Sequence, residues 1–242
     1  MQFNIVALSF ILVLIPLLIS YKFKIGIEKE LFINSIRALL QLTALGFILG
    51  FLFKITNYFW YIPIIIFMLL YSAYIAKKRS EFSFKAAFFS IGISTVIILS
   101  ILVILKIISL KPFEFIPIAG MIIGNSLNTY TLTINRLKRE IELQKELIEA
   151  FISIGASLNN AYKIMQKESI KAALIPVNNM LQTIGVVAIP GITTGMLLAG
   201  ASPLKAVSYQ IVIIYMLVSI NLFSALFGSI FYLSSKRAYS KL

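Results

Sequence analysis

Long apolar runs separated by short basic segments are the feature of this sequence that most limits how it can fold. A helix needs about 20 mostly apolar residues to cross the hydrocarbon core of a bilayer. Seven stretches meet or approach that length: residues 3–20, 32–53, 58–76, 84–108, 115–134, 176–200 and 204–234. The pattern predicts an all-α, polytopic membrane protein of about seven transmembrane helices.

The composition agrees with this class. Hydrophobic residues make up 60% of the 242 positions, charged residues only 13%, and the mean hydropathy is +0.95. A soluble domain carries about 45–50% apolar and about 25% charged residues. The net charge of +13 does not indicate nucleic-acid binding, because the charges lie in short clusters between the apolar runs. We therefore treat residues 1–242 as one transmembrane domain.

The basic residues predict the orientation. One set of alternate loops comprises residues 21–31, 77–85, 135–175 and the tail after Ser234, and it holds 17 of the 22 Lys and Arg residues. The other set holds 4, and Arg37 lies inside the second span. Since positive loops stay in the cytoplasm, the N-terminus is expected outside and the C-terminus inside. A cleaved signal peptide is the alternative for the first span, but no basic segment precedes its apolar run.

The sixth and seventh spans are the least regular in sequence. Asn178, Asn179, Gln182 and Thr183 lie near one end of the sixth span. With polar residues there, a re-entrant or broken helix is an alternative to a continuous span. The seventh span is long enough either to tilt or to contain a break.

The longest segment outside the spans, residues 135–175, is predicted to be a cytoplasmic helical hairpin. It extends the fifth helix with an apolar face made by Leu137, Ile141, Ile148 and Ile152. Gly155 is a helix terminator and Ser157 an N-cap, so a second helix is expected over 158–173, before Pro176. Such a hairpin can dock on a soluble partner. The alternative is an amphipathic hairpin on the lipid headgroups.

Polar residues within the spans have two interpretations. Asn125, Ser126, Asn128 and Thr129 cluster on the fifth span, and Gln182, Thr183, Thr193 and Thr194 on the sixth. They form either interhelical hydrogen bonds or the lining of a translocation path. In the second span Arg37 and Gln41 share a face, where Arg37 either snorkels to phosphates or lines a vestibule with Gln41. Three Gly-x-x-x-Gly motifs, which begin at Gly46, Gly120 and Gly191, predict close helix packing.

The sequence offers little chemistry for catalysis. It contains neither a Gly-x-x-x-x-Gly-Lys-Ser/Thr loop nor any His, Cys or Asp, so the chain is not expected to hydrolyse ATP. Transition metals prefer imidazole, carboxylate and thiolate ligands, which the spans lack. A metal path would use amide, hydroxyl, thioether or backbone oxygen groups. A secondary transporter or channel remains an alternative, although no midplane charge and no internal repeat supports it; a non-transporting receptor component is another.

Two sequence patterns resemble ABC transporter permeases. Residues 149–155, Glu-Ala-Phe-Ile-Ser-Ile-Gly, resemble the Glu-Ala-Ala-x-x-x-Gly coupling loop, with Phe151 in place of the second Ala. Residues 117–126, Pro-Ile-Ala-Gly-Met-Ile-Ile-Gly-Asn-Ser, resemble the Pro-x-x-Gly-Met-x-x-Gly-Asn-Ser signature of the FetB/YbbM family of iron-export permeases, to which plant aluminium-tolerance permeases are related. Further matches run from Arg37 to Gln210.

The resemblance implies a permease subunit in the cell inner membrane. It would form a homodimer, bind a separate ATPase subunit that holds ATP and Mg, and export a metal ion, with iron implied by the family. The residues implied in coupling to the ATPase are Glu149, Ala150, Gly155, Ala156, Ser157, Leu158 and Asn160. The candidates for the path are Arg37, Gln41, Met121, Asn125, Ser126, Asn128, Thr129, Gln182, Thr193, Thr194 and Gln210. The sequence departs from the family at Ile192, Thr193 and Met196, where Met, Met and Gln are expected, so the substrate and its ligands are left open.

Overall fold

A computed structural model of the chain describes residues 9–52 and 57–239. The described residues form helices and turns, with no β-strand among them, which confirms the prediction of an all-α membrane protein. Four described helices are long and apolar enough to cross a bilayer, and a shorter apolar helix precedes them. The count of seven spans and the orientation stay predictions.

The chain divides into two compact units, Met1–Ile55 and Thr56–Leu242. The first unit contains α2 (Ile11–Lys22) and α3 (Glu28–Leu52). The turn between them places Gly26 at φ +83°, a conformation that glycine adopts without strain. The Ser20 hydroxyl then donates a 2.6 Å hydrogen bond to the Glu28 carboxylate across the turn. Residues 3–8 of the predicted first span lie outside the described residues.

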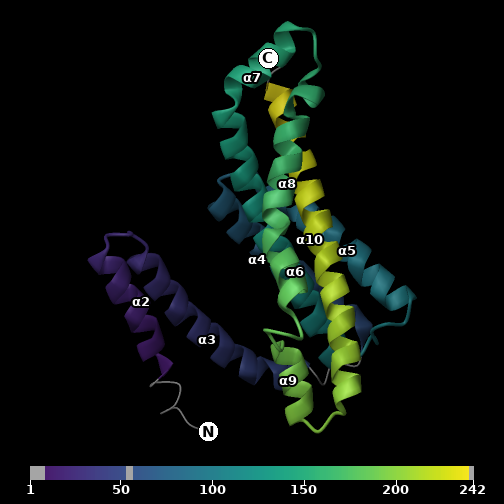
Figure 1. Cartoon of the computed structure of the whole chain (residues 1–242). Helices are drawn as coiled ribbons and strands as arrows, with labels where there is room; N and C mark the ends of the chain where they lie inside the picture. The colour runs from purple at the N-terminus through teal and green to yellow at the C-terminus, as the bar shows by residue number, and fades with distance from the viewer. Residues whose placement is uncertain (1–8, 53–56, 240–242) are drawn as a thin grey trace. The chain divides into compact units, whose positions relative to one another are not determined.

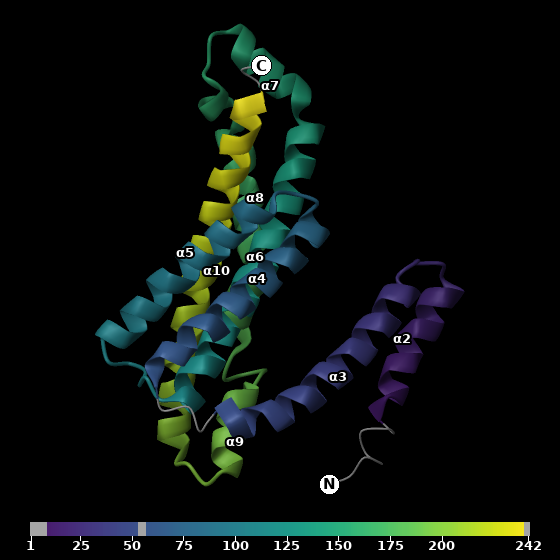
Figure 2. The same cartoon turned by 180° about the vertical axis from the view of Figure 1, so that it is seen from behind.

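The second unit contains the remaining helices (Figures 1 and 2). In chain order they are η1 (Tyr58–Trp60), α4 (Tyr61–Ser80), α5 (Phe84–Ile104), α6 (Pro112–Leu143), α7 (Lys145–Ser153), α8 (Leu158–Thr183), α9 (Gly191–Leu198) and α10 (Pro203–Tyr239). The helix starts follow ordinary rules, since Ser83 caps α5 by accepting a bond from the Ala86 amide and Pro112 opens α6.

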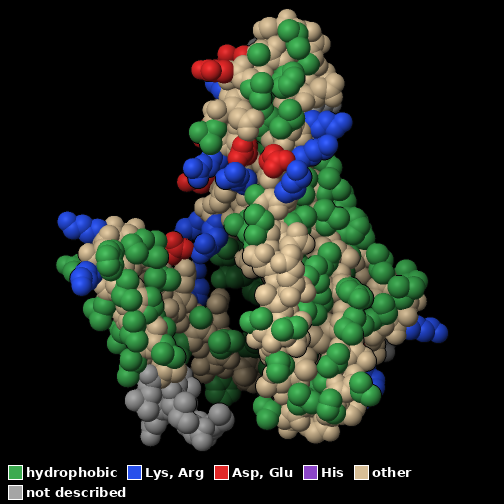
Figure 3. Space-filling view, viewed as in Figure 1, with side chains coloured by type: hydrophobic (Ala, Val, Ile, Leu, Met, Phe, Trp, Pro, Cys, Tyr) green, Lys and Arg blue, Asp and Glu red, His purple; other side chains and the backbone are tan. Residues whose placement is uncertain are grey.

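The core of this unit surrounds α6. Helices α4, α5, α8 and α10 all pack on α6, which buries Ile122, Ile123, Ile134 and Leu137 among them. Beyond the α4–α5 turn, α6 and α8 continue together to the end of the unit that carries α7 (Figure 1). In Figure 3, lysines and arginines gather between this end and the apolar surface of the unit.

The structure settles how the last two spans are built. The sixth span is broken, one of the alternatives that the sequence left open: α8 ends at Thr183, residues 184–190 form turns, and α9 begins at Gly191. The seventh is one unbroken helix, α10. The expectation that a separate helix would end at residue 173 was wrong, because α8 runs through Pro176. A proline removes only one helical N–H donor, and neighbouring helices compensate for such a loss within a membrane.

Candidate functional site

The turn between α7 and α8 is the most sharply defined feature of the end that carries α7. Gly155 has φ +85°, its amide donates to Ile152 O at 2.9 Å, and the Ala156 amide donates to Phe151 O at 2.9 Å. This pair of bonds is a Schellman motif, which requires a residue in the left-handed region. The Ser157 hydroxyl then caps α8 by accepting from the Asn160 amide at 3.4 Å. The predicted terminator and N-cap are thus confirmed.

The hairpin is packed rather than loosely tethered. Ile148 of α7 is buried with Leu137 of α6 and with Ala161 and Met165 of α8, in one continuous core cluster. At the junction of α6 and α7, Glu140 forms a 2.7 Å ion pair with Arg136 and accepts a 2.6 Å hydrogen bond from Gln144. A force on α7 would therefore reach both α6 and α8.

The outer surface of the hairpin is uncovered within this unit. Glu149, Ala150, Gly155, Ser157 and Asn160 are exposed, whereas Ala156 and Leu158 are half-buried. Ile154 is 81% exposed at the end of α7, which is unusual for a large apolar side chain. The Glu149 carboxylate forms an ion pair with Lys145 of the same helix, at 3.8 Å. All seven predicted coupling residues therefore lie on or beside one exposed surface, which is mixed apolar and acidic.

A second cluster of polar side chains joins α6 to α10. The Ser126 hydroxyl donates to Ser224 Oγ at 2.9 Å, and the Ser224 hydroxyl donates to Ser126 O at 2.7 Å. One turn along, the Thr129 hydroxyl donates to Asn221 Oδ1 at 2.8 Å. All four residues are buried. Two predicted path residues, Ser126 and Thr129, thus have the interhelical bonds that one of the two sequence interpretations required.

The break in the sixth span brings two more candidates together. The Thr193 hydroxyl of α9 lies 3.4 Å from Gln210 Oε1 of α10, and both residues are buried. In the break itself, Thr183 O accepts bonds from the Val187 and Ala188 amides at 2.8 and 3.2 Å. The turn therefore makes part of its own backbone hydrogen bonds, which a backbone inside a bilayer would require.

The other path candidates are spread over α3, α6, α8 and α9. Met121 and Asn125 are half-buried on α6, where the Asn125 amide donates to Met121 O at 2.9 Å, and Asn128 is exposed one turn further along. Gln182 and Thr194 are exposed on either side of the break. Arg37 and Gln41 are exposed on α3, in the other compact unit.

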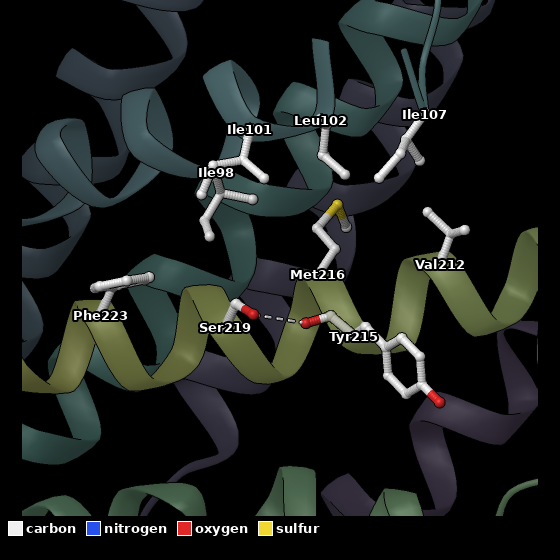
Figure 4. Close-up of a pocket in the computed structure, with 9 residues that line it drawn as sticks. All are labelled: Ile98, Ile101, Leu102, Ile107, Val212, Tyr215, Met216, Ser219 and Phe223. Carbon is white, nitrogen blue, oxygen red and sulfur yellow. Dashed lines mark hydrogen bonds between the residues drawn. The ribbon is translucent and has the colours of Figure 1, made fainter. Parts of the chain in front are cut away.

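Donor groups for a resident metal are few. Within residues 9–52 and 57–239, no group of three or more His, Cys, Asp or Glu side chains is placed to hold an ion. A hollow of about 220 Å³ between α5 and α10 is lined by apolar groups such as Ile98, Leu102 and Met216 (Figure 4). Its Ser219 hydroxyl already donates to Tyr215 O at 2.9 Å. The hollow is thus lined mainly by apolar side chains, and Ser219 and Tyr215 are the hydroxyl-bearing residues of its lining.

The family relationship rests on nearly the whole chain. Residues 3–239 match the family described as Uncharacterised protein family (UPF0014). The chain belongs to the UPF0014 family. The resemblance predicted from residues 37–210 is thereby confirmed.

Relatives of this UPF0014 chain include membrane proteins from bacteria and plants. The probable iron export permease protein FetB of Escherichia coli is 33% identical over 97% of this chain and 91% of its own length. The UPF0014 membrane protein YjkA of Bacillus subtilis is 34% identical over 89% and 87%. Protein ALUMINUM SENSITIVE 3 of Arabidopsis thaliana is 33% identical over 88% and 79%. No solved structure matches the chain.

Sequence reasoning missed the partners on α10 in this UPF0014 chain. Asn221 and Ser224 complete the α6–α10 cluster, and the Ser90 hydroxyl of α5 adds a 3.3 Å bond to Ser224 O. Their spacing was a usable signal, because polar residues three apart in an otherwise apolar helix share one face. The choice of partner depended on packing that the sequence does not show.

Proposed function

We propose that the chain is the membrane-spanning permease subunit of an ABC transporter, and that a separate ATPase subunit docks on the hairpin around α7. The observation that carries this proposal is the uncovered surface from Glu149 to Asn160, held by a Schellman motif and an N-cap. A rigid, exposed turn on packed helices is suited to insertion into a groove of a partner. ATP and Mg would be bound by that partner.

Movement of the hairpin has a direct route into the bilayer. Ile148 packs against both α6 and α8, so displacement of α7 would carry both helices. The break after Thr183 lies about 18 Å along α8 from Lys171, where the basic segment ends. Because a bilayer core is about 30 Å thick, the break would lie inside it. The hairpin therefore lies at the first end of α8 and the break at its other end, so α8 connects the two.

A homodimer supplies the second half of the pathway in this proposal. Gly124, Gly191 and Gly195 have no atom within 4 Å of the place where a Cβ would lie. Glycines that the chain's own helices leave open offer close approach to another helix. These open faces support a second copy as the partner.

Export of a metal ion, with iron as the first candidate, is proposed as the reaction in the cell inner membrane. Support comes from the relative named as a probable iron export permease. The available oxygen groups belong to hydroxyls and amides, which bind transition metals weakly. Weak binding suits a substrate that must leave again, so the ion is treated as cargo.

The docking surface can be tested by co-purification with a candidate ABC ATPase from the same organism. Glu149→Lys reverses the charge on the proposed surface, and Glu168→Lys is a matched control. Both glutamates are exposed on a helix and contact one lysine, Lys145 at 3.8 Å or Lys171 at 2.8 Å. We expect the first variant to lose the ATPase and the second to retain it. Equal retention would remove Glu149 from the interface, and metal flux without any ATPase would favour a secondary transporter.

A further inference from the structure

A hollow of about 350 Å³ lies between α4 and α5, apart from the sites described above. Its lining is apolar and includes Leu69, Phe88, Phe89, Gly92, Ile93 and Val96. Gly92 forms the floor, because a Cβ at that position would meet only Leu69 Cδ1, at 4.0 Å. Phe89 and Val96 are 52% and 59% exposed, so the hollow opens outward as a groove.

The groove faces the hydrocarbon region if α4 and α5 cross the bilayer. Both helices are long and apolar enough to do so. A groove left empty on a lipid-facing surface would forfeit dispersion contacts along its walls. An acyl chain is the apolar, flexible group that the bilayer supplies at that depth. The apolar lining thus fits the acyl chain of a phospholipid.

Lysines stand at one end of the same groove. Lys85, Phe89, Ile93 and Val96 follow one another on a single face of α5, at helical spacing. Lys77 and Lys78 lie in the last turn of α4, across the short turn. In the part of the chain that the structure describes, none of these three lysines forms an ion pair, and all are exposed. Between residues 77 and 85, Glu81 is the single acidic residue.

The basic end of the groove is held in place by α6. Asn135 Nδ2 donates to Arg79 O at 3.3 Å, and Lys138 Nζ donates to Glu81 O at 3.1 Å. These bonds fix the α4–α5 turn, and with it the ends of the two helices that carry the lysines. Lysines on helix ends that are anchored in this way, beside an apolar groove, are complementary to a phosphate with an attached acyl chain.

We propose that this groove binds an anionic phospholipid. One acyl chain lies over Gly92 between α4 and α5, and the phosphate lies between Lys85 and the lysines of the last α4 turn. A second copy of the chain is a poorer occupant, because a twofold contact here would bring the same lysines together. Like charges at close range oppose such a contact.

Quenching of a single tryptophan by brominated lipids tests this site. Trp60 is the one tryptophan of the chain, so Trp60→Phe with Phe89→Trp places the reporter on the groove wall. The protein is reconstituted with phosphatidylglycerol or phosphatidylcholine brominated on the acyl chains. We expect phosphatidylglycerol to be preferred, and Lys85→Gln to lower the preference by about fivefold, the effect of about 1 kcal/mol per lysine.

Two further variants separate the chain site from the headgroup site. Gly92→Leu fills the groove and is expected to reduce quenching by both lipids, whereas Lys106→Gln, beyond the other end of α5, leaves the preference unchanged. Equal quenching by both lipids in the parent, or a preference that survives Lys85→Gln combined with Lys77→Gln and Lys78→Gln, overturns the headgroup assignment. If neither lipid quenches the tryptophan in a monodisperse protein, the groove does not bind an acyl chain and the groove assignment is overturned. A groove covered by a second copy of the chain would give that result.

Discussion

The ring of Tyr130 on α6 lies directly against the backbone of Gly228 on α10. A Cβ added to Gly228 would come within 2.9 Å of Tyr130 Cδ2 and 3.3 Å of Cε2. Tyr130 is fully buried, so its ring has no open space into which to move. This contact sets how closely α6 and α10 approach, and the Ser126–Ser224 and Thr129–Asn221 bonds lie along the same interface.

Gly228→Ala should therefore destabilise the protein by about 1–3 kcal/mol, the usual cost of overpacking a filled core. Thermal unfolding in detergent, followed by size-exclusion chromatography, measures the loss. Tyr130→Phe is the control, because within the described residues the Tyr130 hydroxyl has no hydrogen-bond partner, so its removal breaks no bond and should not destabilise the protein. A Gly228→Ala protein as stable as the parent would contradict the close contact.

The Thr129–Asn221 hydrogen bond should contribute a measurable but modest coupling energy. Interhelical side-chain bonds in membranes average about 0.6 kcal/mol and reach about 1.7 kcal/mol. A double-mutant cycle with Thr129→Val and Asn221→Leu, followed by unfolding in mixed micelles, isolates that term from the packing changes. Strict additivity of the two substitutions would show that the bond contributes nothing.

Gly155 should tolerate Asn better than Val. At φ +85° a side chain with a Cβ is strained, and a β-branched one is strained most, whereas Asn enters this region more readily. Gly155→Val should lower the free energy of opening the α7–α8 turn by roughly 1–2 kcal/mol, with little change in the free energy of global unfolding. Hydrogen exchange at the Ala156 amide, which donates to Phe151 O, reports this opening. Equal protection in both variants would contradict the Schellman geometry.

The turn between α2 and α3 should weaken in acid. The hydrogen bond from the Ser20 hydroxyl, with backbone donors that include the Gly26 amide, lowers the pKa of Glu28 below its ordinary 4.5. A lowered folded-state pKa contributes stability above pH 4.5 that is lost as the pH falls through the folded value. Infrared titration of the carboxylate checks this. Ser20→Ala should move the Glu28 pKa back toward its ordinary value, whereas an unchanged pKa would refute the role of Ser20.

Much of the architecture followed from the sequence because bilayer length and helix caps are local properties. The hairpin was predicted from Gly155 and Ser157, and the polar residues from Asn178 to Thr183 marked the sixth span as the least regular without deciding whether it is broken. The error at Pro176 arose from a local rule, since a proline usually ends a helix in water. Within packed helices the single lost bond does not end α8.

The candidate site was predictable only in part, because partner choice is not local. The positions of Ser126 and Thr129 were visible in the sequence, but their bonds to Ser224 and Asn221 depend on how α6 meets α10. Prediction of the exposed turn from Glu149 to Asn160 succeeded because its geometry is set by adjacent residues. The roles of these residues in transport stay predictions.

Coupling is tested most directly by transport in liposomes that contain this chain together with the ABC ATPase proposed as its partner. With the ATPase facing outward, iron(II) should accumulate in the lumen only when Mg and ATP are added. Glu149→Lys should abolish that accumulation, and Glu168→Lys should not. Iron movement that is equally fast without ATP, or that is unaffected by Glu149→Lys, would contradict coupling through the α7–α8 hairpin.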